Sequence, residues 1–152
     1  MESYMNRISN TGIVPVVKIL EKEDAYPLAK ALLNGGIDVI EVTYRSEHAT
    51  SAIQTISEQL PDMLVGAGTV LSVEQAKEAV EAGAKFIITP GFNTKVVQWC
   101  LDHDVEVYPG VSTASEVEMA LSMGLTQLKF FPAESSGGAK KLKDLSAPYA
   151  NV

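Results

Sequence analysis

Residues 63–91 decide the fold class, and they read MLVGAGTVLSVEQAKEAVEAGAKFIITPG. The short apolar run Met63–Ala67 is followed by a helical pattern over Ser72–Ala82 and by a second apolar run, Lys85–Thr89. A helix that connects two short buried strands lets them lie parallel in one sheet. These residues therefore predict a βα unit followed by the strand of the next one.

The same alternation extends over the chain, and strand starts recur at about 20 to 26 residues. The predicted strands are Ile13–Ile19, Ile37–Val42, Met63–Ala67, Lys85–Thr89, Val105–Tyr108 and Gln127–Phe130. The predicted helices are Lys22–Asn34, Ser46–Leu60, Ser72–Ala82, Thr94–His103, Thr113–Ser122 and the shorter Ala139–Leu145. The chain is therefore an α/β protein with a parallel sheet.

Distinctive segments follow nearly every predicted strand, and this favours a closed barrel over an open sheet. An open sheet concentrates its site at one switch point, whereas a TIM-type (β/α)8 barrel uses all its βα loops. A complete barrel needs about 200 residues or more, and only about six βα units are visible in these 152 residues. We expect residues 1–152 to form a single barrel domain that is incomplete at the C-terminus; the alternative is a smaller α/β sheet.

Composition excludes several classes of partner. The formal net charge is −7, which argues against binding nucleic acid or an anionic membrane surface. No apolar stretch approaches the roughly 18 residues of a membrane span, and the polar start Met1–Asn10 is unlike a secretory signal. The single cysteine, Cys100, excludes an intrachain disulfide and fits a reducing compartment, so we expect a cytoplasmic protein.

Lys129 is the main catalytic candidate, because it lies in an apolar run at the expected end of a strand. Burial there would favour the neutral amine, which attacks carbonyl carbons and forms Schiff bases. The alternative is a lysine whose stem packs in the core while its amine reaches water.

Glu41 and Arg45 form a second candidate group at the end of another strand. In an extended strand Glu41 shares a face with Ile37 and Val39, where a carboxylate is costly unless it is used or paired. It could serve as a general base, with burial raising its pKa towards neutrality, or it could form a cap or an ion pair. The guanidinium of Arg45 suits a carboxylate or phosphate ligand, or a structural pair with Glu41.

The remaining candidates are weaker when each is taken alone. The small residues 66–68 would let a ligand approach the backbone, and Thr69 adds a hydroxyl donor, although a simple turn is also possible. Pro90 marks a turn, and Phe131 could form the wall of a small pocket or pack in the core. No metal site is expected, because His48 and His103 lie well apart with no ligand spacing.

Four motifs in register resemble the 2-keto-3-deoxy-6-phosphogluconate aldolase family, which includes 4-hydroxy-2-oxoglutarate aldolases. They are Glu41–Arg45, Val65–Val70, Thr89–Gly91 and Lys129–Glu134. Their order and spacing match from about Gly12 to the last residue. The resemblance implies an eight-fold barrel that forms a homotrimer. The Gly-rich phosphate-binding loops that follow the family's seventh and eighth strands are not found, so phosphate recognition is expected to be incomplete.

The resemblance also implies the site and its chemistry. Lys129 would form a Schiff base with the 2-oxo group of a small-molecule substrate, and Glu41 would move protons as general acid and base. Arg45 and Thr69 would hold the pyruvate carboxylate, while Pro90 and Phe131 shape the pocket. No metal or organic cofactor is implied.

The implied activity is that of a class I aldolase, a lyase. It would cleave 2-keto-3-deoxy-6-phosphogluconate to pyruvate and glyceraldehyde 3-phosphate, a step of the Entner-Doudoroff pathway of carbohydrate metabolism. It could instead, or also, cleave 4-hydroxy-2-oxoglutarate to pyruvate and glyoxylate. Two alternatives stay open: a catalytically impaired fragment of such an aldolase, and a metal-assisted barrel aldolase or isomerase.

Overall fold

A single curled sheet of six parallel strands organises the protein, whose computed structural model describes residues 4–149 and 151–152. The strand order is β1-β2-β3-β4-β5-β6, so each strand pairs with its neighbour in the chain. The strands are β1 (Val16–Val17), β2 (Val39–Thr43), β3 (Leu64–Gly68), β4 (Phe86–Thr89), β5 (Glu106–Val111) and β6 (Lys129–Phe130). An order without a reversal is that of a barrel, not of a doubly wound sheet.

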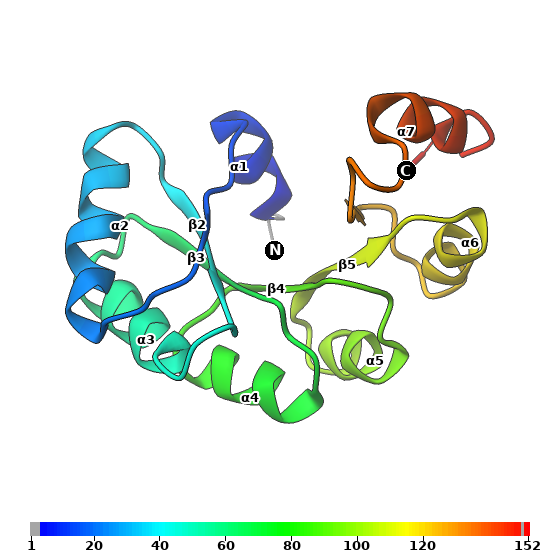
Figure 1. Cartoon of the computed structure of the whole chain (residues 1–152). Coiled ribbons are helices and arrows are strands. Elements are labelled where there is room, and N and C mark those ends of the chain that lie inside the picture. The colour runs from blue at the N-terminus through cyan, green and yellow to red at the C-terminus, as the bar shows by residue number, and fades with distance from the viewer. Residues whose placement is uncertain (1–3, 150) are drawn as a thin grey trace.

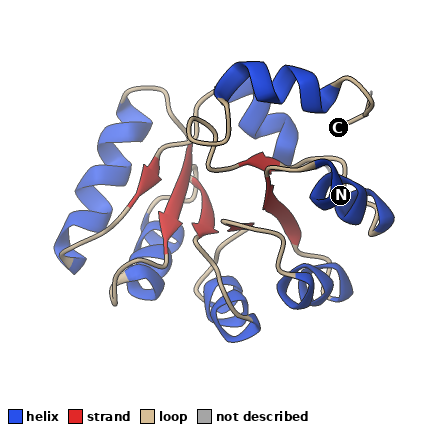
Figure 2. Ribbon diagram, turned by 45° about the vertical axis from the view of Figure 1, so that its right-hand side comes forward, coloured by secondary structure: helices blue, strands red, loops and turns tan. Residues whose placement is uncertain are grey.

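Helices follow the strands and lie along the outside of the curl (Figure 1). They are α2 (Ala25–Asn34), preceded by the 3-10 turn η1 (Lys22–Asp24), α3 (Ala49–Gln59), α4 (Val73–Glu81), α5 (Thr94–Asp102), α6 (Ala114–Ser122) and α7 (Gly138–Ser146). Figure 2 shows the strands in the centre and the helices around them. The predicted barrel of about six βα units is confirmed as a half-barrel, with element ends that differ from prediction by a few residues.

Side-chain caps and a glycine explain where several of the helices begin and end. The Ser72 side chain accepts a hydrogen bond from the Gln75 backbone N–H at the start of α4. Thr113 and Glu116 form a reciprocal capping box at the start of α6. Gly83 follows α4 with φ of 105°, a left-handed conformation that glycine adopts without strain.

Both faces of the sheet are buried, which explains the nearly continuous apolar strands. Along β2, Ile40 and Val42 pack in the cluster that the helices cover, whereas Val39 packs in a second cluster on the inner face with Leu64 and Phe86. Glu41 lies between Ile40 and Val42 in the sequence and therefore shares the inner face with Val39. The inner face of the half-barrel is thus apolar at one end and carries Glu41 towards the other.

The helix α1 (Tyr4–Thr11) was not predicted from the sequence. It packs Tyr4, Met5 and Ile8 against the inner apolar cluster. Hydrogen bonds to Asp38 attach it to the start of β2: Arg7 Nε donates to the carboxylate at 2.6 Å, Arg7 Nη2 donates to the backbone carbonyl at 3.1 Å, and Thr11 Oγ1 donates to the carboxylate at 2.5 Å. Helix α1 therefore covers the inner face near the start of the strands and leaves their carboxyl ends open.

The described residues include no helix that is long and apolar enough to cross a membrane.

Candidate active site

Lys129 and Glu41 meet across the inside of the half-barrel. They come from β6 and β2, with three strands between them in the sheet, and the Lys129 Nζ lies 3.5 Å from the Glu41 Oε1. An ordinary N–H···O hydrogen bond spans about 2.7–3.2 Å, so this ion pair is loose. Only the curl of the sheet can bring two strands so far apart in order to this distance. The structure therefore unites the two residues that the sequence placed at separate strand ends.

Glu41 is the more buried partner, with 3% of its side chain exposed. A β-carbon on Gly68 of the neighbouring strand would overlap the Glu41 carboxylate, so only glycine leaves room for it there. We expected the glycines of this segment to let a ligand approach the backbone. The structure corrects this for Gly68, because the group that occupies the space is the side chain of Glu41.

Burial raises the pKa of Glu41 above its ordinary value, because a carboxylate in this site loses solvation by water. The nearby positive charges of Lys129 and Arg45 lower the pKa again, but they do not cancel the effect of burial. The sequence analysis predicted this direction. A carboxyl group whose pKa is raised keeps its proton to a higher pH than an ordinary carboxyl group, which suits a residue that both takes and gives protons.

Lys129 is only partly buried, with 28% of its side chain exposed, so the structure favours the alternative of a lysine whose amine reaches water over a lysine enclosed in apolar surroundings. The reason is its place on β6, a two-residue strand at the edge of the described sheet. Its Nζ lies 5.2 Å from the centre of the Phe131 ring, a cation–π distance. The amine is therefore held between a carboxylate and an aromatic ring, with access from solvent.

Arg45 lies beyond the end of β2 and is exposed. Its Nε donates to the Thr43 hydroxyl at 3.1 Å, and within the described residues its two terminal guanidinium nitrogens have no hydrogen-bond partner. The part of the chain that is described holds no ion pair between Arg45 and Glu41, so the alternative of a structural pair is not supported. Arg45 is available to bind an anion at the open end of the half-barrel.

Thr69 and Pro90 follow β3 and β4 at the same end of the sheet, since carboxyl ends of parallel strands share one edge. Thr69 is half-buried with φ of 55°, a left-handed conformation that is strained for a residue other than glycine. Such strain is concentrated at functional sites. Pro90 is half-buried and Phe131 is exposed. The roles of these residues in binding stay predictions.

Thr43 is a polar residue near the site that the sequence reasoning did not single out. It is 1% exposed at the end of β2, and its hydroxyl bonds to both Val17 and Arg45. The sequence does contain a signal for Thr43, because a threonine two residues after Glu41 places a second polar group on the same face of the strand.

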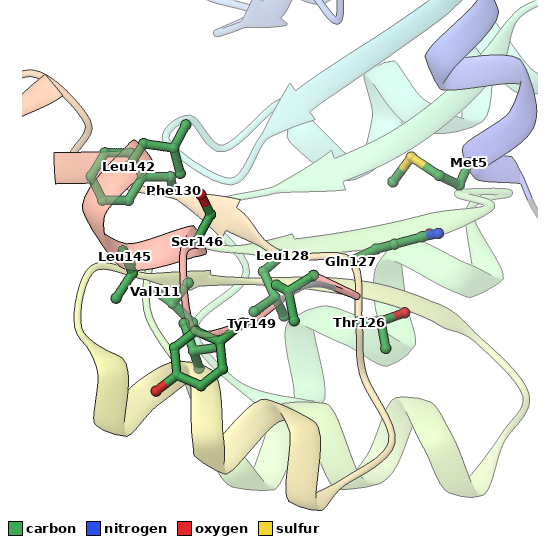
Figure 3. Close-up of a pocket in the computed structure, with 12 residues that line it drawn as sticks. Met5, Val111, Thr126, Gln127, Leu128, Phe130, Leu142, Leu145, Ser146 and Tyr149 are labelled. Atoms are coloured by element: carbon green, nitrogen blue, oxygen red, sulfur yellow. The ribbon is translucent and has the colours of Figure 1, made fainter. Parts of the chain in front are cut away.

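A separate apolar cavity of about 330 Å³ lies beside β6, between the sheet and α6 and α7 (Figure 3). Leu128, Phe130 and Leu142 are among its lining residues, and neither Glu41 nor Lys129 is. Successive side chains of a strand point to opposite faces, so Phe130 faces this cavity while Lys129 faces the inside of the half-barrel. The cavity is therefore distinct from the site around the ion pair.

Among the residues that the structure describes, no three His, Cys, Asp or Glu side chains cluster as a metal site would require. His48 and His103 lie at the start of α3 and at the end of α5, and Cys100 is buried in α5. The metal-assisted alternative thus has no ligand set in this part of the chain.

Comparison with known proteins places these observations in one family. Residues 4–152 match the family model for KDPG and KHG aldolases. The chain is 46% identical over 152 residues to the 2-dehydro-3-deoxy-phosphogluconate aldolase of Treponema pallidum, covering 100% of this chain and 72% of that protein. It is 43% identical over 146 residues to the KHG/KDPG aldolase of Escherichia coli K12, covering 95% and 68% of the two chains.

Solved structures agree with the sequence comparison. The KDPG aldolase of Legionella pneumophila, whose crystal structure holds pyruvate captured at low pH as a covalent carbinolamine intermediate, superposes with a TM-score of 0.89. The two sequences are 42% identical, and the match covers 91% of this chain and 68% of that one.

The buried position of Glu41 predicts a pH-dependent effect of Glu41→Gln on the free energy of unfolding. Because the folded state raises the Glu41 pKa, ionising this group costs stability, and the loss grows as the pH rises above the ordinary carboxyl range. Well below that range Glu41 is protonated in both the folded and the unfolded chain, so the loss of stability disappears. Relative to the parent chain, Glu41→Gln should therefore gain stability between pH 4 and pH 8, measured by urea unfolding at each pH.

The matched control is Glu81→Gln, which removes an exposed carboxylate at the end of α4. Its stability relative to the parent chain should change little over the same pH range. A stability difference for Glu41→Gln that stays constant with pH would show that Glu41 ionises as easily in the folded chain as in the unfolded one.

Proposed function

Because the chain belongs to the KDPG and KHG aldolase family, we propose that it is a class I aldolase that uses Lys129 as its Schiff-base residue. The proposed substrate is 2-keto-3-deoxy-6-phosphogluconate, which gives pyruvate and glyceraldehyde 3-phosphate, and/or 4-hydroxy-2-oxoglutarate, which gives pyruvate and glyoxylate. The observation that carries the proposal is the 3.5 Å distance between the Lys129 Nζ and the Glu41 Oε1 in a site that is open to solvent. A nucleophile and a proton-transfer group are thereby placed side by side.

The first half of the reaction forms the imine. The Lys129 amine, in its neutral form, attacks the C2 ketone carbon of the 2-oxo acid and gives a carbinolamine. The carbinolamine hydroxyl then takes a proton from solvent, which reaches the partly exposed Lys129, and leaves as water, so that a protonated imine remains. The Legionella relative holds pyruvate as this kind of covalent carbinolamine. The loose contact between Lys129 and Glu41 leaves the amine able to turn towards the ketone.

The second half breaks the C3–C4 bond. Glu41 accepts the proton of the C4 hydroxyl, the C3–C4 electron pair moves into the protonated imine, and an aldehyde and an enamine result. Glu41 then returns a proton to C3, and water hydrolyses the imine to release pyruvate and the free amine. A carboxyl group whose pKa is raised by burial is suited to both transfers.

The carboxylate of the substrate is held by Arg45 and Thr69. The two unpaired guanidinium nitrogens of Arg45 match the two oxygens of a carboxylate. Fixing the carboxylate aligns the C3–C4 bond with the π system of the imine, and such positioning supplies several kcal/mol of the barrier. Pro90 and Phe131 limit the space around the reacting atoms, and Phe131 contacts the Lys129 amine directly.

Trapping with borohydride tests Lys129. Incubation with pyruvate and borohydride should reduce the imine to a stable secondary amine on Lys129, located by peptide mass spectrometry. Lys129→Arg keeps the positive charge beside Glu41 but cannot form the imine, so it should give no adduct. An adduct on Lys18 or Lys95 with none on Lys129 would show that Lys129 is not the Schiff-base residue. A parent chain that gives no adduct at all would support the alternative of a catalytically impaired chain.

Proton exchange tests Glu41. The variant Glu41→Gln should exchange the pyruvate methyl protons with deuterated water about 10²–10⁴-fold more slowly than the parent chain, followed by proton NMR. Imine formation on Lys129 should persist, because the nucleophile is intact. Glu81→Gln should exchange at the parent rate. Unchanged exchange in Glu41→Gln would mean that another group or a water molecule moves the proton.

We also propose that the protein is a cytoplasmic homo-oligomer, and specifically a trimer. Within the described residues, β1 and β6 form the two edges of the sheet, and Ile13, Val16 and Leu20 near β1 are exposed. Exposed strand edges and apolar side chains favour association. The free thiol of Cys100, buried in α5, is compatible with a reducing compartment.

Light scattering at micromolar concentration should give three times the 16.3 kDa of one chain. Ile13→Lys, which adds a charge just before β1, should weaken association. The control Met119→Lys changes an exposed residue of α6 and should leave the mass unchanged. A monodisperse monomer of the parent chain would contradict this proposal without affecting the assignment of Lys129.

A further inference from the structure

Thr43 connects three parts of the molecule at the open end of the half-barrel. It is the last residue of β2, two residues after Glu41, and it is 1% exposed. A buried hydroxyl must find hydrogen-bond partners, since leaving it unpaired costs stability. Thr43 finds one partner in β1 and another in the loop that follows β2.

The direction of these two bonds is fixed by chemistry. The Thr43 Oγ1 donates its single proton to the backbone carbonyl of Val17 at 2.7 Å. It then has only lone pairs left, and with these it accepts the Nε–H of Arg45 at 3.1 Å. The backbone N–H of Arg45 also donates to the backbone carbonyl of Thr43 at 2.8 Å. The chain of bonds thus runs from Arg45 through Thr43 to the end of β1.

This arrangement holds the inner nitrogen of the guanidinium and leaves the outer two unpaired within the described residues. Arg45 is exposed, and an exposed arginine without a tether samples many rotamers. A side chain that is already held in its binding orientation loses less entropy when a ligand arrives. Burial protects the Thr43 hydroxyl from competition by water, so the tether can act although the guanidinium itself is solvated.

We propose that Thr43 is a positioning residue that orients the Arg45 guanidinium towards the carboxylate of the 2-oxo acid. The inference rests on the proposed function, in which Arg45 binds that carboxylate. Thr43 does not touch the reacting atoms. With pyruvate, in which no C3–C4 bond is broken, its effect is therefore on the affinity for the charged ligand and not on the attack by Lys129.

The test compares Thr43→Val, which keeps the shape and removes the hydroxyl, with Thr43→Ser, which keeps the hydroxyl. The measured quantity is the pyruvate concentration that gives half-maximal borohydride trapping on Lys129. Thr43→Val should raise this concentration about tenfold, or about 1.4 kcal/mol, while the trapping rate at saturating pyruvate stays near that of the parent chain. Thr43→Ser should behave like the parent chain.

Two further measurements separate positioning from a structural role. With pyruvamide, which has no carboxylate, Thr43→Val and the parent chain should be trapped at equal concentrations. In an Arg45→Ala background, Thr43→Val should cause no additional change, because the two residues act through one interaction. Arg45→Lys keeps the charge but lacks the Nε–H that Thr43 accepts, and it should also raise the half-maximal pyruvate concentration.

The possible failures are distinguishable. If Arg45→Ala traps pyruvate like the parent chain, the carboxylate role of Arg45 in the proposed function is wrong. If Arg45→Ala weakens trapping but Thr43→Val does not, or if Thr43→Val affects pyruvate and pyruvamide equally, the positioning role is overturned. Should Thr43→Val fail to fold, Arg45→Lys decides: parent-like affinity for pyruvate in that variant shows that no tether is needed.

Discussion

The contact between Glu41 and Lys129 is the constraint on which the rest of the structure depends. A carboxylate with 3% of its side chain exposed is costly to bury, and its positive partner comes from a strand four places away in the sheet. The two groups meet only because the sheet curls, and Glu41 has room only because Gly68 lacks a side chain. Glu41, Gly68 and Lys129 lie far apart in the sequence and come together at one point in the folded chain.

The curl in turn depends on the different coverage of the two faces of the sheet. Helices pack on the outer face through small and branched residues, among them Ala52, Ile53 and Ala76, so they can approach the strands closely. On the inner face, α1 packs against the apolar cluster at one end of the strands. The opposite end is left to polar side chains. The division of the inner face into an apolar floor and a polar rim is therefore a property of the fold, and the site occupies the rim.

Much of this fold could be predicted from the sequence, because its signals are local. Strands, helices, caps such as Ser72 and Thr113, and the glycine that follows α4 act within a few residues of one another. Helix α1 escaped prediction because it is short and its packing partners are remote in sequence. The same reason applies to the site: the exposure of Lys129, the space at Gly68 and the bond from Thr43 to Val17 all depend on which strands become neighbours.

Glu41 and Arg45 are held in opposite ways, and each way suits its proposed task. Glu41 lies in a site where the effect of burial outweighs that of its positive neighbours, so its pKa is raised. Arg45 is solvated, keeps its charge, and is held through one nitrogen by a buried hydroxyl. A proton-transfer group works best with a pKa shifted towards the working pH, whereas an anion-binding group requires a permanent charge in a fixed orientation. Placing both on β2 and the loop after it, with Thr43 between them, allows one short segment to supply both functions.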